Sequence, residues 1–253
     1  MVSMQSSFIA VSGAAGRIGH AVVTKLLADG HNVLGLESDR SRLDEAFPDD
    51  LDRFIGLHAD VREPNAVSKA LSVAENKFGQ LTGAVHAAYP RTADWGASLE
   101  DVTPESLKDN LFGQLGGTIL FSREVTARME SAGGASLVLV SSIQGVRAPR
   151  FDHYEGLSMS SPAEYTAIKA GVIAFTGWLA KHLAGTSVRV NCVSPGGIEA
   201  DQPEVFKDRY RQDCLTKGLL DPEDVVGAIS FLLSEDSRFI SGQNIVVDDG
   251  WSL

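Results

Sequence analysis

Short apolar runs alternate with longer stretches of helical period along the whole chain. Apolar runs rich in β-branched side chains predict strands at 8–12, 32–37, 54–58, 83–87, 136–141, 188–193 and 244–247. Apolar residues spaced three and four apart predict helices at 18–29, 64–78, 104–131, 163–184 and 222–233. Because the strands are almost continuously apolar, we expect a parallel sheet covered by helices on both faces.

This alternation predicts an α/β fold of the doubly wound type, with ligands bound at the carboxyl ends of the strands. The chain has 253 residues and a mass of 27.0 kDa, and no repeat or linker divides it, so residues 1–253 are expected to form one domain. The segment 145–162 is the one long stretch without a clear period. Loops of that length are usually functional or disordered, and as a functional loop this one is expected beside the binding site.

Composition and charge narrow the possible functions. The chain carries 22 Lys and Arg against 33 Asp and Glu, a net charge of -11, which argues against binding to nucleic acid. Two cysteines and the absence of a signal-peptide pattern predict a cytoplasmic protein without disulfides. No apolar run approaches the roughly 18 residues of a membrane-spanning helix. The histidines show no ligand-like spacing, so no metal site is predicted.

A glycine-rich turn joins the first predicted strand to the first predicted helix. Gly13, Gly16 and Gly19 are spaced so that the backbone can turn tightly and approach a pyrophosphate at the amino end of that helix. The position between a strand and a helix favours dinucleotide binding. The alternative is a turn that merely packs the helix on the sheet.

Glu37 ends the second predicted strand, where its charge bears on the choice of cofactor. A carboxylate there accepts hydrogen bonds from the adenosine ribose and repels a 2′-phosphate, which favours NAD over NADP. Arg17 and Arg40 are close enough in the sequence to soften that preference, so NADP is not excluded. The alternative is that Glu37 is a solvated acid in a polar run.

Tyr165 and Lys169 lie one turn apart, early in a predicted helix, so their side chains are neighbours. A phenol is a poor base at neutral pH, and a nearby ammonium stabilises the phenolate. Ser142 directly follows the fifth predicted strand, at the sheet edge where ligands bind. These residues predict an acid–base site, the alternative being an ordinary pair on a surface helix.

Motifs in a fixed order along the chain resemble those of the short-chain dehydrogenase/reductase family, in its single-domain branch. They are the glycine turn, Asp60-Val61, Ser142, the Tyr165/Lys169 pair, the run 191–198 and the tail 242–250. The resemblance covers essentially the whole chain. It implies a Rossmann-type, seven-stranded parallel sheet in the order 3-2-1-4-5-6-7 and a nicotinamide dinucleotide as cofactor.

The resemblance also implies a role for each matched residue. Tyr165 would be the general acid/base, Lys169 would lower its pKa and hold the nicotinamide ribose, and Ser142 would hydrogen-bond the substrate oxygen. Asp60 and Val61 would contact the adenine, and the turn from Pro195 to Ile198 the nicotinamide amide. The full set of implied cofactor-binding residues is Gly13, Ala15, Gly16, Arg17, Ile18, Gly19, Glu37, Asp60, Val61, Ala87, Ala88, Tyr165, Lys169, Pro195, Gly196 and Ile198.

The chain departs from the family pattern at several positions. Arg17 stands where the single-domain branch usually has its middle glycine. The strand-four motif, usually two asparagines, alanine and glycine, is 86–89 here, and we expect its His86 to be packed or hydrogen-bonded rather than catalytic. For the family's helix-four asparagine, which positions a water near the lysine, Gln114 is the favoured counterpart and Asn110 the rival.

Ser142 and Tyr165 are separated by a longer segment than the family commonly has. The extra residues are polar, which suits a hydroxylated, charged substrate better than a steroid or an acyl chain. Candidate substrate-binding residues are Arg91, Arg147, Arg150 and Tyr154. The alternative is that these arginines are solvated or pair with Asp152 and Glu155.

Taken together, the sequence predicts an NAD(P)-dependent oxidoreductase that interconverts a hydroxyl and a ketone on a polar, sugar-like substrate. A weaker resemblance to members of the family from bacterial surface-glycan and flagellin-modification pathways points to sugar phosphates or nucleotide-linked sugars. The alternatives are a redox-neutral epimerase or dehydratase that recycles NAD, and a non-catalytic dinucleotide-binding protein. The resemblance also implies a homodimer or homotetramer, built on the helices that begin near Pro104 and Ala163.

Overall fold

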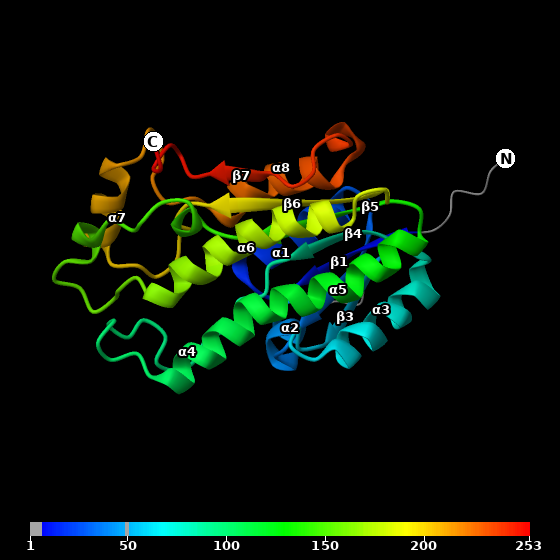
Figure 1. Ribbon diagram of the computed structural model, residues 1–253, viewed down its shortest axis with the longest axis horizontal. Coiled ribbons are helices and arrows are strands. Elements are labelled where there is room, and N and C mark those ends of the chain that lie inside the picture. The colour runs from blue at the N-terminus through cyan, green and yellow to red at the C-terminus, as the bar shows by residue number, and fades with distance from the viewer. Residues whose placement is uncertain (1–6, 49–50) are drawn as a thin grey trace.

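The computed structural model describes residues 7–48 and 51–253 as an α/β fold built on one parallel sheet (Figure 1). Its strands are β1 (Ser7–Ser12), β2 (Asn32–Glu37), β3 (Phe54–His58), β4 (Gln80–His86), β5 (Ala135–Val140), β6 (Val188–Pro195) and β7 (Asn244–Val247). They pair in the order β3-β2-β1-β4-β5-β6-β7, and every neighbouring pair is parallel. The predicted fold class and strand order are confirmed.

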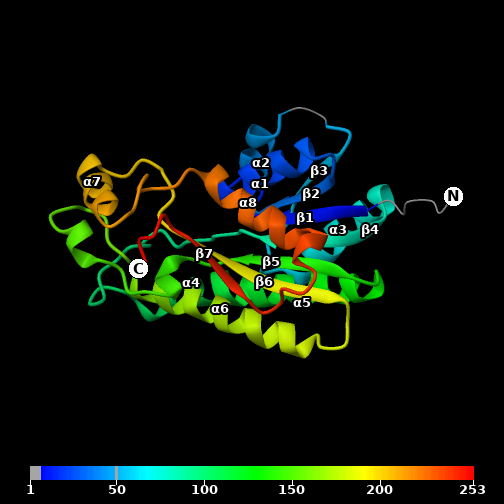
Figure 2. The ribbon, with the colours of Figure 1, turned by 90° about the horizontal axis from the view of Figure 1, so that it is seen from above.

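Helices cover both faces of the sheet (Figure 2). They are α1 (Arg17–Ala28), α2 (Arg40–Ala46), α3 (Pro64–Phe78), α4 (Pro104–Leu111), α5 (Gly117–Ser131), α6 (Ala163–His182), α7 (Glu204–Gln212) and α8 (Pro222–Leu233). One hydrophobic cluster joins the sheet to α3, α5 and α6, and a second joins it to α1 and α8. No helix within residues 7–48 and 51–253 has the length and apolar character needed to cross a membrane.

Several helices begin where the sequence supplies a suitable first turn. Prolines open α3, α4 and α8, where the missing N–H removes no hydrogen bond. Thr103 caps α4 by accepting from the backbone N–H of Ser106 at 3.1 Å. Asp221 and Asp224 form a capping box at the start of α8. These local signals place the helices that carry the chain from strand to strand.

The helix predicted over 104–131 is interrupted. A π-helical turn, Phe112–Gly116, separates α4 from α5. Glycines at 113, 116 and 117 leave room for this wider turn, and a Cβ on Gly117 would lie only 3.0 Å from Val61 Cγ2. The apolar period continues through the turn, which explains why the sequence pattern predicts one continuous helix.

Two short helices, α2 and α7, were not predicted from the sequence. In α2 only Leu43 is buried, and the helix is started by Asp39, which accepts from the N–H groups of Ser41 and Arg42. In α7 only Phe206 and Tyr210 are buried. So few buried positions do not make a helical period that can be recognised in a polar stretch.

The predicted loop 145–162 lies against α7, at the end of the molecule shown on the left of Figure 1. It contains one short 3-10 helix, Phe151–Tyr154. From α7, the guanidinium of Arg209 donates to the carbonyls of Asp152, His153 and Glu155 at 3.3, 3.3 and 2.7 Å. The loop is therefore held in place by a helix that follows it by about fifty residues in the chain.

His86, at the end of β4, is fully packed inside the sheet. Its Nδ1 lies 2.8 Å from Ser12 Oγ at the end of β1, and its ring lies 5.0 Å from the ring of Phe121. Burial, with a smaller contribution from the charge of Lys169, lowers the pKa of His86 to about 3. The expectation of a packed, hydrogen-bonded histidine is confirmed, and it links the two central strands.

This buried histidine predicts a specific loss of stability in acid. The unfolded chain binds a proton at His86 below pH 6.5 and the folded chain only near pH 3, so the stability that His86 contributes is lost as pH falls across that window. The slope should approach about 1.4 kcal/mol per pH unit. Denaturant titrations between these pH values should show a shallower decline for His86→Asn. Parallel curves for the variant and the natural protein would contradict this account.

Candidate active site

A cleft of about 990 Å³ opens at the carboxyl ends of the strands, as expected for a doubly wound sheet. Its walls come from the ends of β1 to β6, the loop 149–159, the first turns of α6 and part of α7. The predicted residues that line it are Gly13, Ala15, Gly16, Arg17, Ile18, Glu37, Asp60, Val61, Ala87, Ala88, Arg91, Ser142, Arg150, Tyr154, Tyr165, Lys169, Pro195, Gly196 and Ile198. Gly19, Gln114 and Arg147 are not part of its lining.

The glycine turn is tight enough to need glycine. Gly13 has a φ of 69° and donates its N–H to Leu36 O at 2.8 Å, and a Cβ there would lie 2.7 Å from Ala88 Cα. Gly19 is closer still, because its Cβ would lie 2.0 Å from Gly13 O. The turn packs the start of α1 against the strand ends, and Gly16, Arg17 and Ile18 at that end of the helix line the cleft.

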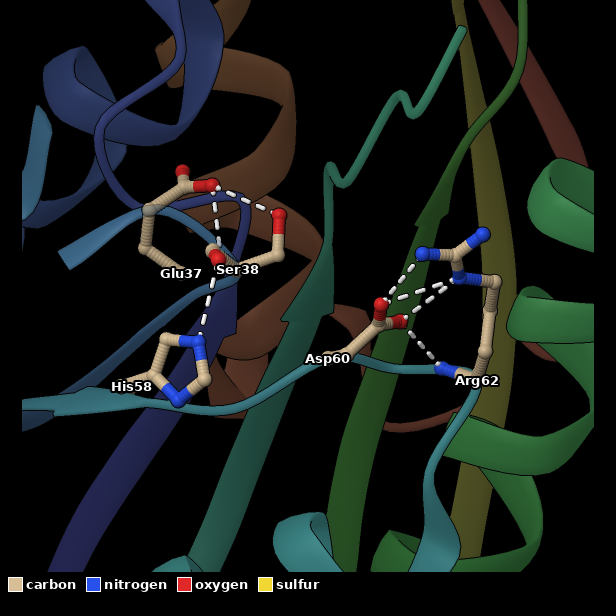
Figure 3. Close-up of polar contacts among 5 residues, drawn as sticks. All are labelled: Glu37, Ser38, His58, Asp60 and Arg62. Carbon is tan, nitrogen blue, oxygen red and sulfur yellow. Dashed lines mark hydrogen bonds and ion pairs between the residues drawn. The ribbon is translucent and has the colours of Figure 1, made fainter. Parts of the chain in front are cut away.

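Glu37 is buried at the end of β2 and turns its carboxylate toward the glycine turn. It accepts from Ser38 N at 2.9 Å and from Ala15 N at 3.3 Å (the Ser38 contacts are drawn in Figure 3). Arg42 lines the cleft nearby and donates to Ala15 O at 3.3 Å. The predicted alternative of a solvated acid does not hold, since the side chain is 6% exposed.

The two arginines expected to soften the cofactor preference are engaged elsewhere. Arg40 pairs with Asp44 one turn along α2, with Nη2 2.7 Å from Oδ1. Arg17 lines the cleft but lies 3.6 Å from the Asp201 carboxylate in an exposed ion pair. Arg42, which the sequence did not single out, is the arginine beside Glu37.

Asp60 follows β3 and is held by Arg62 (Figure 3). The Arg62 guanidinium donates to both carboxylate oxygens, with Nε 3.0 Å from Oδ1 and Nη2 2.6 Å from Oδ2, and its backbone N–H adds a contact of 2.8 Å. Burial alone would raise the pKa of Asp60, but these hydrogen bonds outweigh it and the pKa is lowered. The carboxylate is therefore fixed and charged at the edge of the cleft.

Ser142, Tyr165 and Lys169 meet at the other end of the cleft. The Ser142 hydroxyl caps a short 3-10 turn, Ile143–Gly145, by accepting from Gln144 N at 3.2 Å. Gly145 packs directly on α6, since a Cβ there would lie 2.7 Å from the Lys169 carbonyl carbon. This close packing sets the serine beside the tyrosine–lysine pair.

The environment of the pair shifts both of its pKa values. Burial raises the pKa of Tyr165, and a hydrogen bond with Ser142 acts in the opposite direction. Burial lowers the pKa of Lys169 to about 8. The Lys169 ammonium donates to Val140 O at 3.2 Å and lies 5.5 Å from the centre of the Tyr165 ring. The expected lowering of the Tyr165 pKa by Lys169 is therefore not found, because burial of the phenol dominates, and Lys169 is the member of the pair whose pKa lies near neutral pH.

The two candidates for the helix-four asparagine lie in different surroundings. Asn110 uses its whole amide in contacts with Thr92, Ser106 and Glu164. Gln114 sits in the π-helical turn, and among the described residues neither its amide oxygen nor its amide nitrogen has a hydrogen-bond partner, although both are buried. The structure therefore leaves Gln114, and not Asn110, with an amide available for a ligand or a water.

The candidate substrate residues are only partly brought together. Arg91 lines the cleft, with its guanidinium 5.3 Å from the centre of the Tyr89 ring. Tyr154 lines it too and packs on Phe206. Arg147 instead donates to Ser252 O at 3.2 Å outside the cleft lining, so the structure does not bring it together with the other candidates.

Arg150 pairs with Asp213, at 3.2 Å. The alternative to substrate binding, in which it pairs with Asp152 or Glu155, is therefore not found. The same carboxylate binds His153, whose Nε2 lies 2.6 Å from Oδ2. His153 is buried, lines the cleft and contacts the rings of Tyr210 and Trp251. No periodic pattern in the sequence predicts this cluster, and the polar character of 145–162 is the one feature that could have pointed to it.

Comparisons with known proteins agree with this geometry. A family model described as enoyl-(acyl carrier protein) reductase matches residues 13–252. The chain is 37% identical to the post-translational flagellin modification protein A of Campylobacter coli, over 99% of this chain and 100% of that protein. It is 28% identical to the 7alpha-hydroxysteroid dehydrogenase of Bacteroides fragilis, over 100% and 97% of the two chains.

Among solved structures, a short chain dehydrogenase from Leptospira borgpetersenii with bound NAD+ superposes with a TM-score of 0.87 at 28% identity, covering 98% of this chain and 94% of that one. The chain belongs to the short-chain dehydrogenase/reductase family. It is therefore an oxidoreductase of the kind that works with a nicotinamide dinucleotide and a small-molecule substrate.

Proposed function

We propose that the protein is an NAD-dependent oxidoreductase that interconverts a hydroxyl and a ketone on a polar, sugar-like or phosphorylated substrate. One observation carries this proposal: a single cleft runs from the glycine turn and Glu37 to Ser142, Tyr165 and Lys169. The first group suits a dinucleotide, and the second suits a carbonyl or hydroxyl oxygen.

The residues at the nucleotide end fit a dinucleotide. The glycine turn is closely packed and presents backbone N–H groups, which suits a pyrophosphate, and Glu37 suits the adenosine ribose. Asp60 and Val61 would hold the adenine, Ala87 and Ala88 the adjoining ribose, and the turn from Pro195 to Ile198 the nicotinamide amide. When bound, the cofactor supplies or accepts a hydride.

The chain's own residues would move the proton. The Tyr165 hydroxyl would give a proton to the substrate oxygen during reduction and take it back during oxidation. Ser142 would hydrogen-bond the same oxygen, where charge develops. Lys169 would stabilise the phenolate form of Tyr165 and hold the nicotinamide ribose, and the unpartnered amide of Gln114 would position a water that links Lys169 to solvent.

The preference for NAD is tested at Glu37. Glu37→Gln keeps the size of the side chain and an oxygen that can accept from Ala15 N but removes the negative charge. Without that charge a 2′-phosphate is no longer repelled, and kcat/KM for NADP relative to NAD should rise about tenfold or more. The ratio is measured with both cofactors on one substrate. An unchanged ratio would place the discrimination elsewhere, for instance at Arg42.

A polar substrate is supported by the residues at the far end of the cleft. Arg91, Arg150, His153 and Tyr154 all line it. The 37% identity to a flagellin modification protein supports a substrate that serves the modification of a protein, which is compatible with a sugar-like compound. Of these two arginines, Arg150 pairs with Asp213, whereas Arg91 has no carboxylate partner among the described residues.

Arg91 is therefore the residue expected to bind an anionic substituent. Arg91→Ala should raise KM for a phosphorylated substrate about tenfold, because a charge-assisted hydrogen bond is lost. Arg147→Ala is the matched comparison, since this arginine lies outside the cleft lining, and KM should stay within about twofold. Steady-state kinetics of both variants measure these two KM values. An equal rise in both would contradict the assignment of Arg91.

The proposal as a whole is tested by following nicotinamide absorbance with NAD, NADP and a panel of sugar phosphates, nucleotide-linked sugars, steroids and simple alcohols. A signal confined to the sugar compounds supports it, and a signal confined to steroids overturns the substrate class. Product formation without a net absorbance change would indicate the redox-neutral epimerase or dehydratase. Cofactor binding with neither result would indicate the non-catalytic protein.

We also infer a homodimer or homotetramer built on α4, α5 and α6. Ile119 on α5 and Trp178 on α6 are 42% and 60% exposed and would be covered in such an assembly, whereas Val172 lies in the core. Size-exclusion chromatography with light scattering tests this inference.

A further inference from the structure

Tyr89 has contacts that its place in the sequence does not explain. It follows β4 at the carboxyl end of the sheet, lines the cleft, and stands where the family's strand-four motif usually has glycine. The Lys169 ammonium lies 5.4 Å from the centre of its ring, and the rings of Tyr165 and Trp95 meet it edge to face at 5.7 and 5.6 Å. One side chain thus touches both members of the tyrosine–lysine pair.

Lys169 has little else to compensate its charge. The residue is 7% exposed. Among the described residues, the only hydrogen bond of its ammonium group is to Val140 O, and no carboxylate lies within ion-pair distance of it. The titratable groups around it are Tyr165 on α6, His86 on β4, Cys192 on β6 and Tyr89 itself. With the two phenols and the Cys192 thiol protonated and His86 neutral, none of these groups carries a negative charge.

The face of an aromatic ring carries negative electrostatic potential, and its attraction for a cation is strongest where water is excluded. We propose that Tyr89 is a positioning residue whose ring holds the ammonium of Lys169, in its charged form, beside Tyr165. The proposal rests on the role given to Lys169 in the proposed function and goes beyond it, because it makes the charge of Lys169 depend on a residue outside the Ser–Tyr–Lys set.

The experiment measures the protonation of Lys169 directly and needs no substrate. In the full-length protein, carbon-13 labelled lysine side chains are titrated by NMR, and the Lys169 signal is assigned by its loss in Lys169→Arg. Tyr89→Leu removes the ring and should lower the pKa of Lys169 by roughly one unit, a tenfold weaker hold on the proton. Tyr89→Phe keeps the ring and should shift it by less than about 0.3 units.

Arg91→Ala provides the matched control, because it removes the other cation that lies over the same ring. Loss of a neighbouring positive charge can only raise the pKa of Lys169, the opposite direction from Tyr89→Leu. Should Tyr89→Leu not fold, Tyr89→Met, which also keeps an apolar side chain over the ammonium, is expected to give the same fall. Tyr89 is 40% exposed, so both changes leave the core intact.

An unchanged pKa of Lys169 in Tyr89→Leu or Tyr89→Met overturns the proposal. So does an equal fall in Tyr89→Phe, which would assign the effect to the hydroxyl. With an identified substrate, the pH profile of kcat should shift in the leucine variant and recover in the phenylalanine variant. A silent substrate panel would count against the proposed function but would leave the NMR result standing, so the two failures are distinguishable.

Discussion

Tyr165→Phe is expected to lower kcat by at least about a thousandfold while leaving the dissociation constant for NADH nearly unchanged. The variant keeps the ring, and with it the edge-to-face packing on Tyr89 and Trp95 at 5.7 and 5.8 Å, so the cleft should keep its shape. What it loses is the hydroxyl that exchanges a proton with the substrate oxygen. Stopped-flow or steady-state turnover, together with a fluorescence titration of NADH, separates the two effects.

Ser142→Ala provides the comparison for this prediction. It removes a hydrogen bond to the substrate oxygen but no proton donor, so its loss should be smaller, about a hundredfold. If Tyr165→Phe retained most of its turnover, Tyr165 would not be the acid/base. If it lost turnover and NADH affinity together, its role would lie in binding.

The sequence was sufficient for those parts of the fold and site that depend on local pattern. Apolar strand runs predicted the parallel sheet, and residues at the ends of strands or just after them, such as Gly13, Glu37 and Ser142, were predicted to share one edge. This followed because the carboxyl ends of parallel strands lie on the same side. The helical spacing of Tyr165 and Lys169 likewise predicted that they are neighbours.

Features that depend on contacts between distant segments could not be predicted this way. Asp213 pairs with both Arg150 and His153, and His153 lies 60 positions before Asp213 in the sequence. The short helix that ends just before Asp213 buries too few side chains to show a period. The π-helical turn at Gln114 is also not visible in the apolar pattern, because the residues that it buries, Gly113 and Gln114, do not mark an apolar helix face.

Neither the apolar pattern of the sequence nor the fold determines which substrate the protein binds. The relatives at 37% and 28% identity carry names as different as flagellin modification and steroid dehydrogenation, on one architecture. This is expected when a common scaffold supplies the hydride and proton chemistry and variable loops select the substrate. In this chain the residues proposed to select the substrate are Arg91 and those of 145–162 and α7 that line the cleft, so we expect variants there to alter KM more than cofactor affinity.

Gly19→Ala is the substitution expected to damage the nucleotide end of the site most. Its Cβ would lie 2.0 Å from Gly13 O and 2.8 Å from Gly13 C, and both are backbone atoms of the tight turn that cannot rotate away. Either α1 or the turn must move, which should cost about 3 kcal/mol of folding stability and weaken NADH binding by about a hundredfold or more. Denaturant unfolding and NADH titration measure the two losses.

The same change at Gly227, on α8, separates this clash from the general effect of alanine in a helix. A Cβ at Gly227 meets no atom within 4 Å, so Gly227→Ala should stabilise the protein by about 0.5 to 1 kcal/mol and leave NADH affinity unchanged. Opposite signs at two helical glycines would show that the turn at Gly13 requires a bare backbone at Gly19. If Gly19→Ala matched Gly227→Ala, the close approach of α1 to the turn would be wrong, and with it the geometry proposed for the pyrophosphate.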